Sequence, residues 1–360
     1  MKWFKIGFLL TGVLANITEE ANNELPDYEN YNITRMAELT LEQDAGLKNR
    51  QSLMAGPQTV ISDIAKIFTL KVLLDLYKMF LQTPPKLLFQ PRNIAHGSIQ
   101  EVRDHLAHSL LAICPAQKIL GFQCICDKTY KHITVHEDRG MEALAAVAVH
   151  PVQKTIIVSY RPTLTIKNWI TDADYEWVDY PDAPKGTRVH SGFYSHFLST
   201  QKASQEAVIK LLGNPDLRNY DLLVSGYSLG SALAILSLPH WSQILKSRND
   251  TRKLHSFVYA GPRVGNEQFA QYITSLNIPL TRYTNRNDIV SHVPPRTYGF
   301  VHVGAEIHEH QPHIFAKPEL KVCSQHYDED PQCGYRNRVL LSAVRHILPL
   351  DRFLPIPPYC

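Results

Sequence analysis

The sequence has little net charge. Its 37 Lys and Arg residues nearly balance its 34 Asp and Glu residues, which leaves a formal net charge of +3 and no block of like charge. A strongly basic surface for nucleic acid is therefore not indicated. The chain also contains no internal repeat and no low-complexity tract, and its 360 residues correspond to one large domain or two small ones.

The start of the chain lacks an apolar run long enough to cross a bilayer comfortably. Lys2 and Lys5 precede a short apolar core at residues 8–14, and Val13-Leu14-Ala15 offers small residues for cleavage. This order is typical of a secretory signal peptide, which we predict over residues 1–15. An uncleaved signal anchor is the alternative.

Cysteine is absent from the first 113 residues. The six cysteines that follow are an even number, which fits a disulfide framework in an oxidising compartment, and they stand at positions 114, 124, 126, 323, 333 and 360. Sequons for N-glycosylation begin at Asn16, Asn32 and Asn249. These features agree with a secreted, extracellular glycoprotein.

Residues 16–95 form a cysteine-free segment that differs in composition from the rest of the chain. Within it, residues 59–82 carry apolar side chains at roughly helical spacing before Pro84-Pro85. We interpret residues 16–95 as the helical propeptide of a zymogen, which masks the substrate groove or assists folding. The alternatives are an ordinary N-terminal extension and a membrane-surface helix, and the second is weaker because Asp63 and Asp75 dilute its basic face.

Residues 96–360 alternate between predicted strands and predicted helices. Strands are expected at 144–149, 155–160, 222–225, 253–260 and 280–284. Helices are expected at 101–113, 203–212, 229–238 and 339–347. The alternation predicts one α/β domain with a largely parallel central sheet that helices cover on both faces.

A candidate nucleophile, Ser228, stands at the centre of Gly226-Tyr-Ser-Leu-Gly230. The pattern itself occurs by chance in roughly one chain of this size in ten. Here, however, it lies between a buried strand and an Ala/Leu-rich helix, which is the context that holds a nucleophilic serine on a strained turn. The glycines permit close packing, and the positive end of the helix dipole favours negative charge near Ser228.

A nucleophilic serine needs a base, and the base needs an acid that orients it. In this type of fold the acid follows the serine, and the histidine comes last. Asp288 follows the strand at 280–284, so a loop would hold it at the carboxyl edge of the sheet; taken alone, it would instead be interpreted as a solvated loop residue. His346 is the preferred base because its segment is apolar and close to Cys360, which can tie the chain end to the body. The competing histidines are His292, His302, His308, His310, His313 and His326.

The cluster His308-Glu-His-Gln-Pro-His313 raises the alternative of a metal site. It lacks a carboxylate or cysteine pattern of known ligand spacing, so a surface strand or loop that carries histidines is favoured. The sequence therefore predicts no metal and no other cofactor.

Further motifs are spread over residues 97–360: VSYRPT (158–163), IKNWI (166–170), VHSGF (189–193), GPRVGN (261–266), NDIVSHVPP (287–295) and RHILPL (345–350). With GYSLG (226–230) and the final cysteine, they make this region resemble the fungal class 3 lipases, the secreted Rhizomucor and Rhizopus type of triacylglycerol lipase. The resemblance implies an α/β-hydrolase fold and a catalytic triad of Ser228, Asp288 and His346. It also implies an oxyanion hole formed by the backbone N–H groups of Thr163 and Leu229.

The resemblance also implies that the segment after Thr163 is a lid helix. Ile166, Trp169 and Ile170 lie on one apolar face of this helix, which would cover the acyl groove when closed and meet lipid when open. An ordinary core-facing helix fits this periodicity equally well. The implied disulfides are Cys114–Cys360, Cys323–Cys333 and Cys124–Cys126, the last of which would close a very small ring.

The sequence departs from the family pattern beside the nucleophile and beside the oxyanion residue. Tyr227 stands where the family usually has histidine, Ser231 replaces a usual second glycine, and Pro162 replaces a glycine. Proline has no N–H, but the required donor belongs to Thr163, so the oxyanion hole is retained in principle. The family's local Cys-x-x-Cys is Cys124-Ile-Cys126 here.

The implied function is hydrolysis of the carboxylic ester bonds of acylglycerols at a lipid–water interface, by a monomer with no obligate protein partner. One alternative is a feruloyl or short-chain esterase on the same fold. The other is a secreted binding protein whose catalysis Tyr227 and Pro162 have impaired.

Overall fold

The computed structural model describes residues 99–121, 129–163, 175–311, 319–324, 328–337, 341 and 343–346. The expected signal peptide at 1–15 and propeptide at 16–95 lie outside these residues. So do the residues expected in the lid, Ile166, Trp169 and Ile170, and the cysteines Cys124, Cys126 and Cys360.

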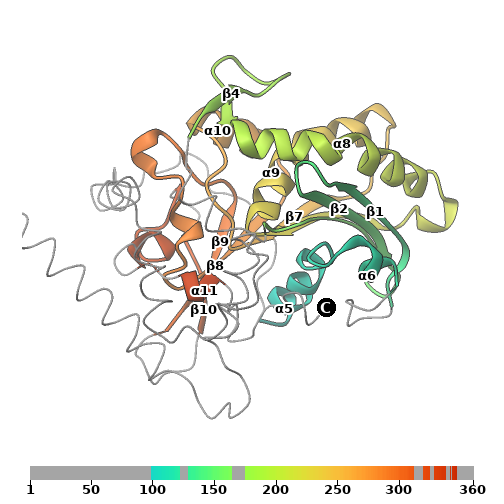
Figure 1. Cartoon of the computed structure of the whole chain (residues 1–360), viewed down its shortest axis with the longest axis horizontal. Helices are drawn as coiled ribbons and strands as arrows, with labels where there is room; N and C mark the ends of the chain where they lie inside the picture. Colours follow the sequence, from blue (N-terminus) through green and yellow to red (C-terminus); the bar gives the residue numbers. More distant parts are fainter. Residues whose placement is uncertain are drawn as a thin grey trace, which may run out of the picture.

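An eight-stranded sheet forms the centre of the described structure (Figure 1). Its strand order is β1-β2-β3-β6-β7-β8-β9-β10. The pairs from β3 to β9 in this order are parallel, and the pairs β1–β2, β2–β3 and β9–β10 are antiparallel. The strands are β1 (Lys131–Asp138), β2 (Ala143–His150), β3 (Thr155–Tyr160), β6 (Asp221–Tyr227), β7 (Leu254–Tyr259), β8 (Leu280–Asn285), β9 (Ala305–His310) and β10 (Glu319–Val322). A separate two-stranded sheet pairs β4 (Trp177–Asp179) with β5 (Arg188–His190).

Helices cover both faces of the large sheet (Figure 1). The helices α8 (Ser191–Leu212), α9 (Leu229–Ser247) and α10 (Glu267–Ser275) pack on one face, and α5 (Ile99–Ser109) and α6 (Ala116–Leu120) pack on the other. Along β2, Val147 belongs to the first core cluster and Ala146 to the second. The predicted α/β architecture with a mostly parallel sheet is confirmed.

The remaining helices among the described residues are short. They are the 3-10 turns η2 (Pro215–Leu217), η3 (Val290–His292), η4 (Arg296–Tyr298) and η5 (Gly334–Asn337), and the four-residue α-helix α11 (Ala343–His346). Throughout the described part of the chain, no helix combines the length and the apolar character that a membrane-spanning helix needs.

Several expected segments differ from the structure. The helix expected at 203–212 already begins at Ser191, and the helix expected at 101–113 ends at Ser109. The helix expected at 229–238 continues through Pro239 to Ser247, because Trp241 and Ile244 extend its buried face into the core. The histidine-bearing segment expected at the surface includes β9, which lies between β8 and β10. His308 on this strand is only 1% exposed, so the surface expectation is wrong for this residue.

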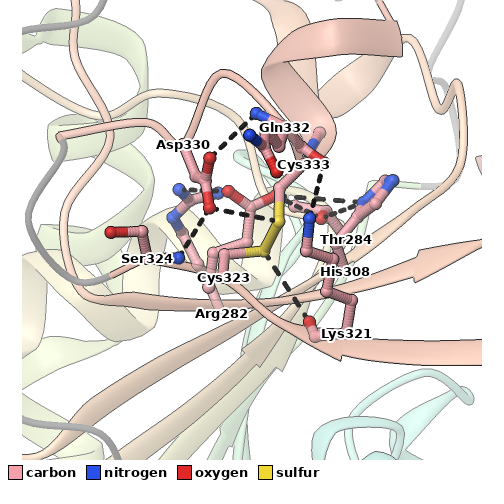
Figure 2. The surroundings of a disulfide bond; sticks show 11 residues. Arg282, Thr284, His308, Lys321, Cys323, Ser324, Asp330, Gln332 and Cys333 are labelled. Carbon is pink, nitrogen blue, oxygen red and sulfur yellow. Dashed lines mark hydrogen bonds and ion pairs between the residues drawn. A yellow bond between two sulfur atoms is a disulfide. The ribbon is translucent and has the colours of Figure 1, made fainter.

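A disulfide joins Cys323, which follows β10, to Cys333 (Figure 2). This disulfide is one of the three that the family resemblance implies. Cys114 is also disulfide-bonded and buried. The pairing of Cys114 with Cys360 stays a prediction, because Cys360 lies outside the described residues.

Candidate active site

The candidate nucleophile stands on a sharp turn between a strand and a helix. β6 ends at the residue before Ser228, and α9 begins at the residue after it. Ser228 has φ 56° and ψ −124°, a conformation that is strained for a residue with a side chain. Strain of this kind at a strand–helix junction is what holds the serine of the Gly-x-Ser-x-Gly motif in place.

Both glycines of the motif are required by close backbone contacts. A Cβ added to Gly226 would lie 2.2 Å from the carbonyl oxygen of Gly230. A Cβ added to Gly230 would lie 2.1 Å from the carbonyl oxygen of Tyr160, at the end of β3. The turn can therefore form only because both positions lack a side chain.

Asp288 and His346 come together although 58 residues separate them. Nδ1 of His346 lies 3.0 Å from Oδ1 and 2.9 Å from Oδ2 of Asp288, and both residues are buried. Oδ1 of Asp288 also accepts a hydrogen bond of 2.9 Å from the N–H of Val290. A carboxylate only accepts, so Nδ1 of His346 carries the proton. Nε2 of His346 has no hydrogen-bond partner among the described residues, which leaves its lone pair available.

The competing histidines make other contacts. The ring nitrogens of His292 lie 2.8 and 3.0 Å from the backbone oxygens of Asp288 and Gly334, and Nε2 of His302 lies 2.8 Å from a backbone oxygen. Burial lowers the pKa of His292 and His302, and it lowers the pKa of His308 to about 4. Among the described histidines that follow Asp288, His346 is the one whose ring contacts the Asp288 carboxylate. His313 and His326 lie outside the described residues.

The two expected oxyanion donors are carried by segments that touch. Leu229 begins α9, and Thr163 follows β3 by three residues. The first turn of α9 packs directly on the end of β3, because the missing Cβ of Gly230 faces the backbone of Tyr160 and Arg161. Pro162, the residue after Arg161, is buried. Proline fixes the backbone angle φ, so one backbone angle is fixed in the segment that joins β3 to Thr163.

Ser231 links the helix of the nucleophile to two strands. Its Oγ lies 2.9 Å from the carbonyl oxygen of Gly226 and 2.6 Å from that of Tyr259 on β7. The N–H of Tyr259 donates to the same Oγ at 3.1 Å. The hydroxyl of Ser231 therefore forms its hydrogen bonds with backbone groups around the motif.

The sequence does not predict two hydrogen bonds that side chains of the sheet make with α11. The hydroxyl of Tyr227 donates to the carbonyl oxygen of His346, and Nδ2 of Asn285 donates to that of Arg345 at 2.5 Å. The ring centroids of Tyr227 and His346 lie 5.3 Å apart. No local pattern signals these contacts, because Tyr227 and His346 are 119 residues apart in the chain.

Arg263 of the GPRVGN motif holds the loop that follows Asp288. Its Nε and Nη2 each donate to a carboxylate oxygen of Glu329 at 2.7 Å, and its Nη1 donates to the carbonyl oxygens of His292 and Pro294 at 2.5 and 3.0 Å. Burial by itself would raise the pKa of Glu329, but the Arg263 guanidinium holds this pKa well below its ordinary value. The sequence motif gave no indication of this role.

One group of three candidate metal ligands exists among the described residues, formed by Cys323, Asp330 and Cys333. The two sulfurs are bonded to each other, so neither is available as a thiolate ligand. Asp330 instead accepts backbone hydrogen bonds from Ser324 and Gln332, at 2.6 and 2.8 Å, and so closes the loop around the disulfide (Figure 2).

Comparison with known proteins finds similarity to lipases. Residues 157–298 match the family described as Lipase (class 3). A lipase from Rhizomucor miehei is 35% identical over 191 residues, which cover 51% of this chain and 51% of that protein. The secreted mono- and diacylglycerol lipase A of Penicillium camembertii is 32% identical over 165 residues, which cover 44% of this chain and 50% of that protein.

The fold is also shared with a solved lipase. The structure of lipase II from Rhizopus niveus superposes with a TM-score of 0.62 and 28% identity, over 73% of this chain and 98% of that one. The chain spans about half the length of the two curated relatives described above. Residues 157–298 therefore resemble the class 3 lipases, and the described structure shares the fold of a solved lipase.

Proposed function

We propose that this chain is a secreted triacylglycerol lipase, a serine hydrolase that cleaves the carboxylic ester bonds of acylglycerols. The single observation that carries the proposal is the buried contact between Nδ1 of His346 and the Asp288 carboxylate. It leaves Nε2 of His346 as an acceptor in a site whose serine stands on a strained turn. Serine, acid and histidine follow one another in the chain order of this type of fold.

In the proposed mechanism, Nε2 of His346 takes the proton of Ser228 Oγ as Oγ attacks the ester carbonyl carbon. The N–H groups of Leu229 and Thr163 stabilise the oxyanion of the tetrahedral intermediate, and loss of one such donor typically raises the barrier by about 2.7–4 kcal/mol. The intermediate collapses, and the leaving alcohol receives the proton from His346. Water then attacks the acyl-enzyme with His346 as the base, which releases the fatty acid and restores Ser228.

Asp288 acts through the histidine in this mechanism. Its carboxylate accepts from Nδ1 and so keeps the lone pair on Nε2, where the serine proton must go. It also stabilises the imidazolium that forms during the attack. The hydrogen bond from Val290 N–H fixes the carboxylate itself.

The location and the lipid contact are part of the same proposal. Residues 1–15 direct the chain to secretion, residues 16–95 are removed on maturation, and residues 96–360 act as a monomer at a lipid–water interface. Secretion is supported by the Penicillium camembertii relative, whose name describes it as secreted. The lid with Ile166, Trp169 and Ile170 covers the acyl groove when closed, and opens where it meets lipid.

The proposal is tested by measuring the hydrolysis rate of a series of triacylglycerols below and above their solubility limits. We expect the rate to rise when the substrate forms an interface, and the Ser228→Ala protein to be inactive. A Ser228→Ala protein with the parent rate would overturn the proposal. A rate that does not increase above the solubility limit would favour the short-chain esterase instead.

A further inference from the structure

Two neighbouring backbone carbonyl groups of α11 are held by side chains from the central sheet. The Tyr227 hydroxyl donates to the carbonyl oxygen of His346, and Nδ2 of Asn285 donates to the carbonyl oxygen of Arg345. The last carbonyl groups of a helix have no partner within that helix, and a buried one needs a donor from elsewhere. Tyr227 and Asn285 supply these donors to the helix that carries the base.

Both donors come from strands that also position the other catalytic groups. Tyr227 is the last residue of β6 and directly precedes Ser228. Asn285 is the last residue of β8, and its carbonyl oxygen accepts a hydrogen bond of 2.8 Å from the N–H of Asp288. These two hydrogen bonds therefore join α11 to the strand that precedes the nucleophile and to the strand that precedes the acid.

The protonation state of Tyr227 suits a permanent donor. The side chain is 1% exposed, and burial, together with the negative charges of Asp288 and Glu309, raises the pKa of its hydroxyl far above the ordinary value. A phenol whose pKa is raised above its ordinary value keeps its proton at neutral pH, so the hydroxyl can donate there. The ring also packs beside the imidazole, at 5.3 Å between centroids.

We infer that Tyr227 is a positioning residue for the base: with Asn285, it holds the backbone of His346 so that the imidazole stays in place between Asp288 and Ser228. This inference rests on the proposed function. Tyr227 acts through His346, and we do not propose that it contacts the substrate. It also gives the departure from the family's usual histidine a specific role, since the hydroxyl is the atom that makes the contact.

The chain offers a matched control in Tyr259. This residue pairs with Tyr227 across β6 and β7, is fully buried, and donates its hydroxyl to the backbone carbonyl of Val102 in α5. Tyr259→Phe therefore removes the same kind of buried hydrogen bond one strand away, from a helix that carries none of the catalytic groups.

The experiment compares Tyr227→Phe and Tyr259→Phe in the mature protein. We measure kcat and KM on soluble p-nitrophenyl butyrate, and hydrogen–deuterium exchange of the peptide that contains residues 343–346. For Tyr227→Phe we expect kcat to fall roughly 10- to 100-fold, as a displaced catalytic group implies, while KM stays within about 2-fold because no substrate contact is lost. Exchange in residues 343–346 should increase. Tyr259→Phe should match the parent protein in kcat and in this exchange.

Parent values of kcat and exchange in Tyr227→Phe would overturn the inference, as would equal losses of kcat in both variants. If Tyr227→Phe does not fold, Asn285→Ala removes the neighbouring hydrogen bond and must show the same loss of kcat without a change in KM. If the parent protein does not hydrolyse the ester at all, the proposed function fails. The exchange comparison then still decides whether Tyr227 holds α11.

Discussion

Ser231 fills the space that Gly261 leaves open. A Cβ added to Gly261 would lie 2.5 Å from Cβ and 3.1 Å from Oγ of Ser231. Ser231 is thus compatible with the motif because residue 261 has no side chain. The replacement of the usual second glycine by serine is accommodated by the chain that follows β7.

This contact predicts that positions 231 and 261 are energetically coupled. Gly261→Ala should destabilise the parent protein by about 1–3 kcal/mol, because it adds a methyl group to a filled space. In a Ser231→Gly background the same change should cost much less, because the opposing side chain is gone. Urea unfolding of the four proteins gives the coupling free energy, and strictly additive effects would show that the two residues do not press on each other.

Gly230 should not tolerate a side chain. Gly230→Ala would place its Cβ 2.1 Å from the carbonyl oxygen of Tyr160, so α9 must move away from β3 and take Leu229 with it. We expect loss of esterase activity together with a lower free energy of unfolding. Gly213→Ala is the control: Gly213 has φ −80°, and its added Cβ would meet backbone oxygens only at 3.6 and 3.7 Å. That change should be neutral or stabilising by about 0.4–1 kcal/mol. Equal effects of the two alanines would be inconsistent with the packing described.

Arg263→Met tests how far Arg263 stabilises the loop that follows Asp288. The change removes the bidentate partner of the buried Glu329 carboxylate, which keeps Arg296 at 2.9 Å as a second ion pair. The cost should therefore lie below the roughly 3–5 kcal/mol that a fully unpaired buried charge typically costs. The exposed pair of Arg139 and Glu137 is the comparison, and Arg139→Met should cost less than about 1 kcal/mol. Chemical denaturation of both variants measures the difference. A small effect of Arg263→Met would mean that this ion pair adds little to the fold.

The central strands could be predicted from sequence because they are buried on both faces. The strand expected at 155–160 coincides with β3, and those expected at 222–225 and 280–284 lie within β6 and β8. β9, with the sequence AEIHEH, has no such apolar run. It is buried because Glu306 and Glu309 pair with Arg282 and Arg286 at distances of 2.8 and 3.1 Å, contacts that only the tertiary structure creates.

The candidate site also has parts that the sequence predicts and parts that it does not. The strained turn at the candidate nucleophile Ser228 could be predicted because its surroundings are local: a strand, two glycines and a helix in one stretch of chain. The candidate base could not be selected from composition, because seven histidines follow Asp288 and the fold brings the ring of His346 to the carboxylate. The roles of Tyr227 and Arg263 depend on partners 119 and 66 residues away, so no pattern of spacing contains them.

His190 predicts that the protein loses stability in acid. Burial, with a smaller effect from His196, lowers its pKa from 6.5 to about 4, so the unfolded chain binds a proton before the folded chain does. The stability contributed by neutral His190 is therefore complete above pH 6.5 and declines as the pH falls toward 4, by at most about 1.4 kcal/mol per pH unit.

His190→Asn should reduce this decline. Nδ1 of His190 caps α8 by accepting from the N–H of Gly192, and asparagine is also a good N-cap residue but does not titrate. Urea midpoints at a series of pH values between 4 and 7 measure the effect. If the two proteins have parallel profiles, the titration of His190 does not contribute to the acid sensitivity.

Asp288→Asn separates the orienting role of the acid from its structural role. The amide oxygen of asparagine can still accept from the N–H of Val290, so the loop should keep its conformation. The amide nitrogen, however, is a donor and would face Nδ1 of His346, which would then have to accept. The imidazole proton moves to Nε2, where it blocks removal of the proton from Ser228. We therefore expect kcat to fall by a factor on the order of 10⁴ with little change in unfolding free energy, measured on a soluble ester and by urea denaturation. Asp330→Asn, which changes a buried carboxylate beside the disulfide, should leave kcat near the parent value. A kcat of Asp288→Asn within tenfold of the parent would mean that Asp288 does not set the histidine tautomer.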